Sequence, residues 1–270
     1  MDFGISTRCF GTTPLTLDLL ERLRRAEFNK IELHAALPGF DYHNRSLIRS
    51  VARWFAENAL PPPSLHLPVA SPGEDVIGDR PVERQRALDA IKRCLELGDV
   101  MGLTFVVLHL GSPGQAFNPV VFDHAYAAIA TIQSFAGTRV LVETLSNDIA
   151  TFPRILEFKT AAQIPNLGIC YDTGHGEMDG SADAIHLNDN DGSTDNHLWP
   201  FDGRRNWPAF VEKIVSEAFE GPLIFEAGDD RLNKASDCRS RLEDMMDEAR
   251  NSIEEFRLKY NLSAPQKEDE

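Results

Sequence analysis

Nine imidazole and carboxylate side chains lie at or just beyond the ends of short apolar runs in this sequence. In the stretch "GICYDTGH" (168–175), an apolar run ends in Asp172 and His175, two strong metal ligands three positions apart. Imidazole and carboxylate together suit zinc, manganese, iron or cobalt, and the lack of thiolate argues against a structural zinc site. The pattern therefore predicts a catalytic metal centre with positions left for water or substrate. The nine residues are His66, His109, Glu143, Asp172, His175, His186, Asp195, His197 and Glu226.

Each of these residues also has a simpler interpretation. A single histidine at a strand end is more often a hydrogen-bonded packing residue than a ligand. Glu143 in "VLVETL" and Glu226 in "LIFEAG" are harder to explain in that way, because a buried carboxylate is costly unless it is paired or bound to a metal. The remaining histidines, His34, His43 and His124, are expected to have structural or surface roles.

Eight apolar runs alternate with stretches that carry a helical pattern. Several runs are nearly continuous in apolar residues, as parallel strands covered on both faces should be. We therefore predict a single (β/α)8 TIM barrel over residues 1–260 and a disordered tail over 261–270, with the active site at the C-terminal strand ends. A doubly wound open sheet is the alternative, but its GxGxxG sign is absent. The runs are 3–7, 30–35, 64–69, 105–111, 139–145, 167–172, 184–189 and 222–228.

One connection is too short for a full helix. Residues 176–185 read "GEMDGSADAI", so we expect the sixth helix of the barrel to be truncated. Outward side chains of the flanking strands, among them Ile169, Cys170 or Ile185, should then lose their cover. An exposed apolar patch of that size is unusual on a monomer. We expect a second subunit to cover this patch, which would make the protein a homo-oligomer. The alternatives are that the last helix covers it, or that a neighbouring helix shifts over it.

Composition limits the partners and the compartment. The chain of 270 residues has a formal net charge of −15, which argues against a nucleic-acid partner unless a local basic patch exists. Four scattered cysteines suit a reducing compartment, and the sequence shows neither a signal-peptide pattern nor an apolar run long enough to cross a membrane. We expect a cytoplasmic protein.

Basic residues follow the last two predicted strands, where barrels often bind phosphate. They are Arg204, Arg205, Arg231 and Lys234. Solvated surface side chains are an equally good interpretation. The sequence has no GxSxG elbow and no Walker loop, which leaves little support for nucleophilic hydrolase or nucleotide chemistry.

The chain resembles the xylose isomerase-like TIM barrel superfamily, on "LHLG", "LVETLS", "YDTGH", "IHLNDNDGSTDNHLWPFDG" and "IFEAG". This group contains sugar phosphate isomerases and epimerases and also the endonuclease IV type of AP endonuclease (AP endonuclease family 2). For the first branch, the resemblance implies one divalent manganese, zinc or cobalt ion held by Glu143, Asp172, His186 and Glu226. It also implies that the two glutamates move protons through an enediolate, with His175 and Arg204 or Arg205 orienting the sugar or sugar phosphate.

For the endonuclease IV branch, the resemblance implies more than one zinc ion, held by all nine residues named above. His66, His109, His175, Asp195 and His197 are thus additional candidates for metal or substrate ligands. A dehydratase of sugar-like acids would use the same set, and a non-catalytic metal- or sugar-binding barrel is a third interpretation. The acidic charge and the pair of glutamates favour the isomerase or epimerase.

Overall fold

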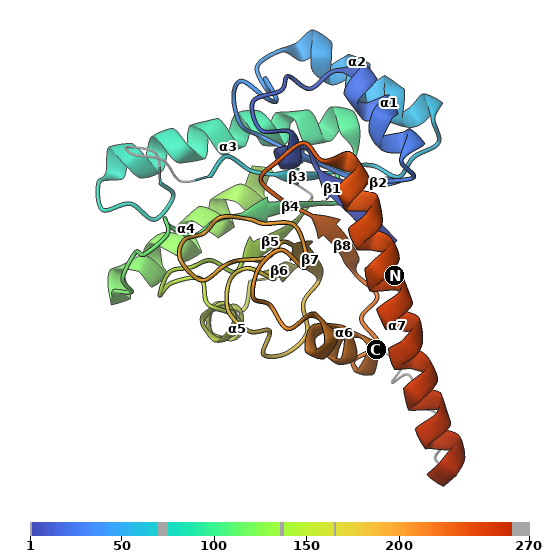
Figure 1. The fold of residues 1–270 in the computed structure, drawn as a ribbon. Helices are drawn as coiled ribbons and strands as arrows, with labels where there is room; N and C mark the ends of the chain where they lie inside the picture. The colour runs from blue at the N-terminus through green and yellow to red at the C-terminus, as the bar shows by residue number, and fades with distance from the viewer. Residues whose placement is uncertain (1, 70–74, 136–137, 165, 261–270) are drawn as a thin grey trace.

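Eight parallel strands close into a barrel in the order of the chain (Figure 1). The computed structural model describes the whole chain except residues 1, 70–74, 136–137, 165 and 261–270, so the predicted disordered tail lies outside the described residues. The predicted TIM barrel is confirmed. The strands are β1 (Asp2–Ser6), β2 (Lys30–His34), β3 (Ser64–His66), β4 (Phe105–Leu108), β5 (Arg139–Glu143), β6 (Leu167–Asp172), β7 (Ala184–Leu187) and β8 (Pro222–Phe225).

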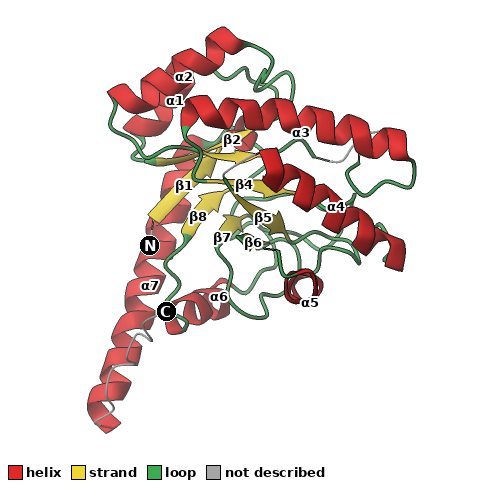
Figure 2. Cartoon of the chain, turned by 180° about the vertical axis from the view of Figure 1, so that it is seen from behind, coloured by secondary structure: helices red, strands yellow, loops and turns green. Residues whose placement is uncertain are grey.

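Helices pack around the outside of the barrel (Figure 2). In α1 the side chain of Thr16 accepts the N–H of Leu19, and Leu20 and Leu23 are buried. The side chain of Asn206 caps α6 in the same way, by accepting the N–H of Ala209. The helices are α1 (Leu17–Arg25), α2 (Arg45–Glu57), α3 (Pro81–Met101), α4 (Pro119–Phe135), α5 (Phe152–Ala162), α6 (Trp207–Ser216) and α7 (Leu232–Tyr260), and a 3₁₀ turn, η1 (Thr7–Phe10), follows β1.

The register of the strands explains why the polar residues meet. Asp172 is paired with His186 across β6 and β7, so two predicted ligands lie side by side. Side chains two positions earlier on a strand face the same side. Val107, Leu141, Cys170 and Ala184 stand in this relation to four predicted ligands, and they form a small apolar cluster of their own. This cluster fills the barrel beneath the polar layer.

The short connection between β6 and β7 is confirmed, because residues 173–183 contain no helix. The expected loss of cover is wrong. Ile169, Cys170 and Ile185 are at most 1% exposed within the single chain. Cys170 faces the barrel interior, while Ile169 and Ile185 belong to the main core.

Residues of the connection and of a neighbouring helix provide the cover instead. Met178 is buried, and Gly180 lies so close to Phe152 of α5 that a Cβ there would be 3.3 Å from its ring. Phe152 also contacts the ring of Tyr171 on β6. Burying such side chains stabilises the fold by about 1.5–3 kcal/mol each. The reason for expecting a second subunit at this face is thereby removed, and a homo-oligomer stays a prediction.

Two smaller observations complete the fold. All four cysteines, Cys9, Cys94, Cys170 and Cys238, are free and buried. Within the described residues, no helix combines the length and the apolar character that crossing a bilayer requires.

Candidate metal centre

The ends of β5, β6, β7 and β8 bring four predicted ligands together. One ligand atom from each of Glu143, Asp172, His186 and Glu226 lies within 4.8 Å of the others, and all four residues are buried. Glu143 and Asp172 are the last residues of their strands, His186 lies within β7, and Glu226 follows β8 directly. Four separate strands of a rigid barrel thus fix the positions of these side chains.

Hydrogen bonds to both carboxylate oxygens hold Asp172 of the motif "YDTGH", one from within the motif and one from Asn188 beyond β7. The amide of Asn188 donates to Oδ2 (2.6 Å), and the backbone N–H of Gly174 donates to Oδ1 (2.7 Å). A Cβ at Gly174 would lie 2.2 Å from Oδ1 of Asn188, so only glycine fits between the two residues. The motif therefore needs its glycine in order to place the carboxylate.

Two imidazole rings contact the same carboxylate oxygen of Glu143. The Nε2 atoms of His66 and His109 each lie 2.9 Å from Oε2 of Glu143. Burial works to lower the pKa of His66, but the Glu143 carboxylate outweighs it and raises the pKa to about 9. Burial would raise the pKa of Glu143 itself, yet the positive field of His186 and His109 holds that pKa well below its usual value.

His186 is surrounded by carboxylates. Its Nδ1 lies 3.2 Å from Oε1 of Glu143 and 3.1 Å from Oε2 of Glu226, and its Nε2 faces Glu32 of β2. Burial favours the neutral ring, but the surrounding acidic groups raise the pKa of His186 well above its usual value. A concentration of negative charge of this kind is suited to a cation.

A second cluster lies beside the first and combines His175, Asp195 and His197. Oδ1 of Asp195 lies 3.0 Å from Nε2 of His175 and 3.3 Å from Nε2 of His197. The other ring nitrogens are engaged with backbone carbonyls, Nδ1 of His175 with Thr144 (2.9 Å) and Nδ1 of His197 with Glu226 (3.0 Å). Burial works against the charged form of His175, but Asp172 and Asp195 raise its pKa to about 10.

Asp189 holds the long loop that carries this second cluster. Its carboxylate accepts the indole N–H of Trp207 (2.8 Å) and the backbone N–H groups of Phe201 and Arg205 (both 3.1 Å). Gly203 passes so close that a Cβ would lie 2.2 Å from the same carboxylate. This buried side chain, two residues beyond β7, thus ties the far end of the loop to its beginning.

The donor set fits one or more divalent metal ions. His175 Nε2, His186 Nδ1 and Glu226 Oε2 are buried and have no hydrogen-bond partner in the described part of the chain, although carboxylate or imidazole atoms lie near them. Buried polar atoms without partners are costly, and a bound cation would remove that cost. Imidazole with carboxylate matches zinc, manganese or cobalt. The nine sequence-predicted ligands thus lie together: four form the first cluster, three form the second, and His66 and His109 contact Glu143 of the first.

The basic residues that the sequence predicts to bind substrate lie away from the proposed metal ligands. Arg205 donates to the carbonyls of Thr173 (2.6 Å) and Gly176 (3.4 Å) and packs over the ring of Tyr171, so it supports the β6 loop. Arg204 is exposed and lies next to Gly192. Arg8 of η1 approaches the ligands instead, with Nε 3.7 Å from Oε1 of Glu226. Substrate binding by Arg204 and Arg205 stays a prediction.

Arg231 and Lys234 form ion pairs away from the ligands. Arg231 lies 2.7 Å from Asp229, and Lys234 lies 2.5 Å from Asp202. Of the other three histidines, His34 packs edge-on against His66 with ring centroids 4.9 Å apart, which places it in the same polar layer. Burial lowers the pKa of His34 to about 3, so its ring is neutral.

Sequence reasoning missed Glu32, Asn188 and Arg8. Glu32 is fully buried and lies beside His186. Its signal is a carboxylate within the apolar run "KIELHA", the same anomaly that marks Glu143 and Glu226. Arg8 and Asn188 carry no such signal, because their contacts depend on which loops meet at the barrel mouth.

A pocket of about 780 Å³ opens beside His175, between the loops after β5 and β6. Its lining includes Leu145, Phe152 and Met178 and three carboxylates, Asp148, Glu177 and Asp179. Among the described residues that line it there is no lysine or arginine. The pocket lies at the C-terminal ends of the strands, where barrel substrates bind.

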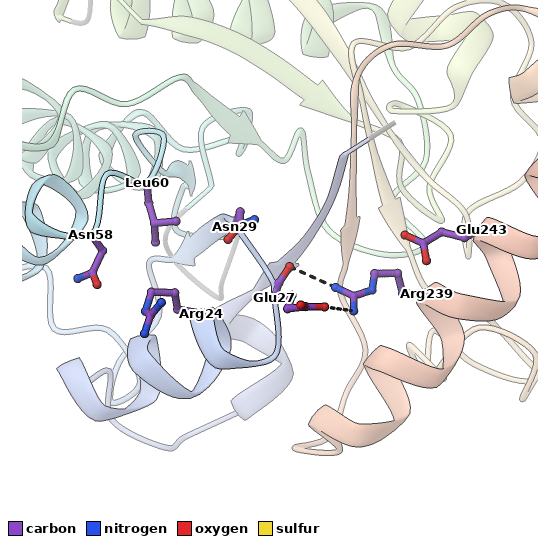
Figure 3. Close-up of a pocket in the computed structure, with 7 residues that line it drawn as sticks. All are labelled: Arg24, Glu27, Asn29, Asn58, Leu60, Arg239 and Glu243. Atoms are coloured by element: carbon purple, nitrogen blue, oxygen red, sulfur yellow. Dashed lines mark hydrogen bonds and ion pairs between the residues drawn. The ribbon is translucent and has the colours of Figure 1, made fainter.

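Another pocket, of about 500 Å³, lies between the α1–β2 and α2–β3 loops and α7 (Figure 3). Arg239 of α7 donates there to the carbonyl and carboxylate of Glu27, and Arg24 is paired with Glu21. Both arginines are thus already paired with glutamates within the chain, and the contacts of Arg239 tie α7 to the loop between α1 and β2.

The xylose isomerase-like TIM barrel family model matches residues 20–256. The chain belongs to this family. A curated relative from Sinorhizobium fredii, the uncharacterized protein y4fM, is 27% identical over 201 residues, which are 62% of this chain and 64% of the relative.

Solved structures of other xylose isomerase-like barrels superpose over nearly the whole chain. An L-ribulose 3-epimerase has a TM-score of 0.78 at 17% identity and covers 99% of this chain and 100% of its own. The IOLI protein with a bound zinc atom has a TM-score of 0.71 at 16% identity and covers 93% of this chain and 99% of its own. At these identities the likeness establishes the fold.

Proposed function

We propose that this xylose isomerase-like barrel is a divalent-metal-dependent isomerase or epimerase of a sugar or sugar phosphate. The observation that carries the proposal is the pair of buried glutamates, Glu143 and Glu226, which both approach Nδ1 of His186 (3.2 and 3.1 Å). A binding site alone has no need of two flanking carboxylates. Enzymes that move a proton between neighbouring carbons do need them, one to accept the proton and one to return it.

Glu143, Asp172, His186 and Glu226 would hold the metal. Bound there, it would supply positive charge to stabilise the negative charge that develops on neighbouring substrate oxygens. The carboxyls of Glu143 and Glu226 have pKa values held well below the usual range by His186, against the effect of burial, so both are ionised at neutral pH.

Either glutamate can then accept the proton from the carbon next to the substrate carbonyl, which leaves an enediolate. Return of the proton to the adjacent carbon gives the isomer, and return to the opposite face gives the epimer. His175, which lines the pocket of about 780 Å³, would orient the substrate from the loop after β6. Names of structural neighbours, such as L-ribulose 3-epimerase, support this reaction class.

A second candidate is a zinc phosphodiesterase of the endonuclease IV type. The observation that favours it is the additional ligand set: His66 and His109 meet on Glu143, and His175, Asp195 and His197 converge nearby. Several adjacent metal ions suit phosphate ester hydrolysis. The net charge of −15 and the carboxylates of the adjacent pocket oppose binding of a nucleic-acid backbone.

Two measurements separate these candidates. Protein purified without chelator and loaded with manganese, zinc or cobalt is incubated in D₂O with a panel of ketoses and their phosphates. We expect metal-dependent incorporation of deuterium at carbon. The same samples are given an abasic DNA duplex, which we expect them neither to bind tightly nor to incise at physiological salt. Incision in proportion to bound zinc, without carbon exchange, would establish the phosphodiesterase.

A further inference from the structure

Glu32 is a fourth buried carboxylate at this site, beneath the three among the proposed metal ligands. It lies in the middle of β2 and is 0% exposed. The hydroxyl of Ser64 on β3 donates to its Oε2 (3.2 Å), and its Oε1 has no hydrogen-bond partner in the described part of the chain. An ionised carboxylate this deep is costly unless a specific partner compensates for it.

That partner is His186. Nε2 of His186 lies 3.3 Å from each of the two carboxylate oxygens of Glu32. The opposite ring nitrogen, Nδ1, faces Glu143 and Glu226, where the metal would bind. The two nitrogens of this ring therefore face two different environments: a single carboxylate below and the ligand cluster above.

We propose that Glu32 is a positioning residue that acts on the metal through His186. A neutral imidazole carries one proton. When Nε2 keeps that proton and donates a hydrogen bond to Glu32, the lone pair of Nδ1 would be directed at the metal, and the carboxylate below would make the ring a stronger ligand. Glu32 itself does not ligate, since the group of four converging ligand atoms does not include it.

A purely structural role for Glu32 would leave this arrangement unexplained. Ser64 could donate to the amide oxygen of a neutral glutamine at this depth, and an apolar residue would avoid the cost of a buried charge altogether. A carboxylate is required only if its partner must carry or donate a proton. The proposal rests on the metal site of the proposed function but is independent of which reaction that site performs.

The test measures metal affinity without substrate. Glu32→Gln and Glu32→Ala are titrated with Zn²⁺ against a chromophoric chelator at pH 7.5, with Glu57→Gln, an exposed residue at the end of α2, as the matched control. We expect Kd to rise about tenfold in Glu32→Gln, which still offers an acceptor oxygen, and up to about a hundredfold in Glu32→Ala. The control should bind like the wild type.

The visible spectrum of the Co²⁺-loaded protein gives a second readout, because the absorption bands of cobalt depend on the strength and geometry of its ligands. We expect these bands to shift in both Glu32 variants. Should Glu32→Ala fail to fold, Glu32→Gln decides. Folded variants with wild-type Kd and spectrum would overturn the proposal, as would a wild-type protein that binds no metal. If the wild-type protein binds metal but exchanges no deuterium at carbon, the proposed isomerase activity would be contradicted. The proposal for Glu32 would be unaffected.

Discussion

Glu226 follows β8 directly and reaches His186 with an oxygen that has no hydrogen-bond partner in the described residues. Glu226→Gln keeps an oxygen for the metal but removes the base. We expect kcat to fall by about a hundredfold or more, as typical general-base contributions predict, with metal content unchanged. Substrate-dependent deuterium exchange measures the loss.

The control for that experiment is Glu254→Gln, an exposed residue on α7. It makes the same chemical change far from the ligands and should exchange at the wild-type rate. Undiminished exchange in Glu226→Gln would remove this residue from the proton-transfer pair.

Most of the candidate site could be predicted from the types of residue that end the apolar runs. His and carboxylate side chains that end apolar runs are unusual, because burial penalises them, so the sequence already identified both clusters. Asn188 and Arg8 were not predictable in this way. Each is an ordinary polar residue whose importance comes from a neighbour distant in the chain, Asp172 for one and Glu226 for the other.

At the scale of the element, Asp189 is the anchor of the loop between β7 and α6. Asp189→Asn replaces one acceptor oxygen by an NH₂ group and should break bonds to Phe201, Arg205 or Trp207. We expect a loss of about 1–3 kcal/mol in the free energy of unfolding, measured with urea. The loop that carries Asp195 and His197 should loosen with it.

Asp191→Asn is the matched control in the same loop. Its carboxylate accepts hydrogen bonds from the backbone N–H and hydroxyl of Ser193 and from the side chain of Asn196, all within the same loop. The substitution should therefore change stability by less than about 0.5 kcal/mol. Equal losses in both variants would contradict the anchoring role of Asp189.

The eight strands could be predicted because a parallel strand covered on both faces must be apolar along its length. Helix boundaries were harder to predict. The helical pattern at the end of the chain is clear over 240–260, "SRLEDMMDEARNSIEEFRLKY", but α7 begins at Leu232. Its first two turns bury small side chains, Ala235 and Cys238, which leave little periodic signal. The cover of β6 and β7 depends on Met178 and Phe152, whose packing no local pattern reveals.

For the whole molecule, binding of a metal must stabilise the native state. At about 100 times Kd the gain is about 2.7 kcal/mol, and for a chain of this size that raises Tm by about 5–10 °C. Thermal unfolding with and without Zn²⁺ or Mn²⁺ measures the shift, and EDTA should reverse it. No shift with either ion, together with no metal in the purified protein, would exclude the metal centre.

The negative charge around the open end of the barrel predicts which substrates bind more tightly. Asp148, Glu177 and Asp179 line the pocket beside His175, and the chain as a whole is strongly acidic. A phosphorylated ketose should therefore bind about tenfold more weakly than its neutral counterpart at low salt, with the difference shrinking as salt screens it. Calorimetric titration of D-fructose and D-fructose 6-phosphate compares them. Tighter binding of the phosphate would contradict this expectation.

The last helix extends well past the barrel that it supports (Figure 1). Its 29 residues make a rod of ~44 Å, yet its buried side chains, from Ala235 to Met246, all lie in the first half. The outer turns depend mainly on their own backbone hydrogen bonds, so they can open and close without disturbing the barrel. Amide protons beyond Arg250 should exchange with solvent in seconds to minutes, while those around Leu242 should wait for the barrel itself to unfold.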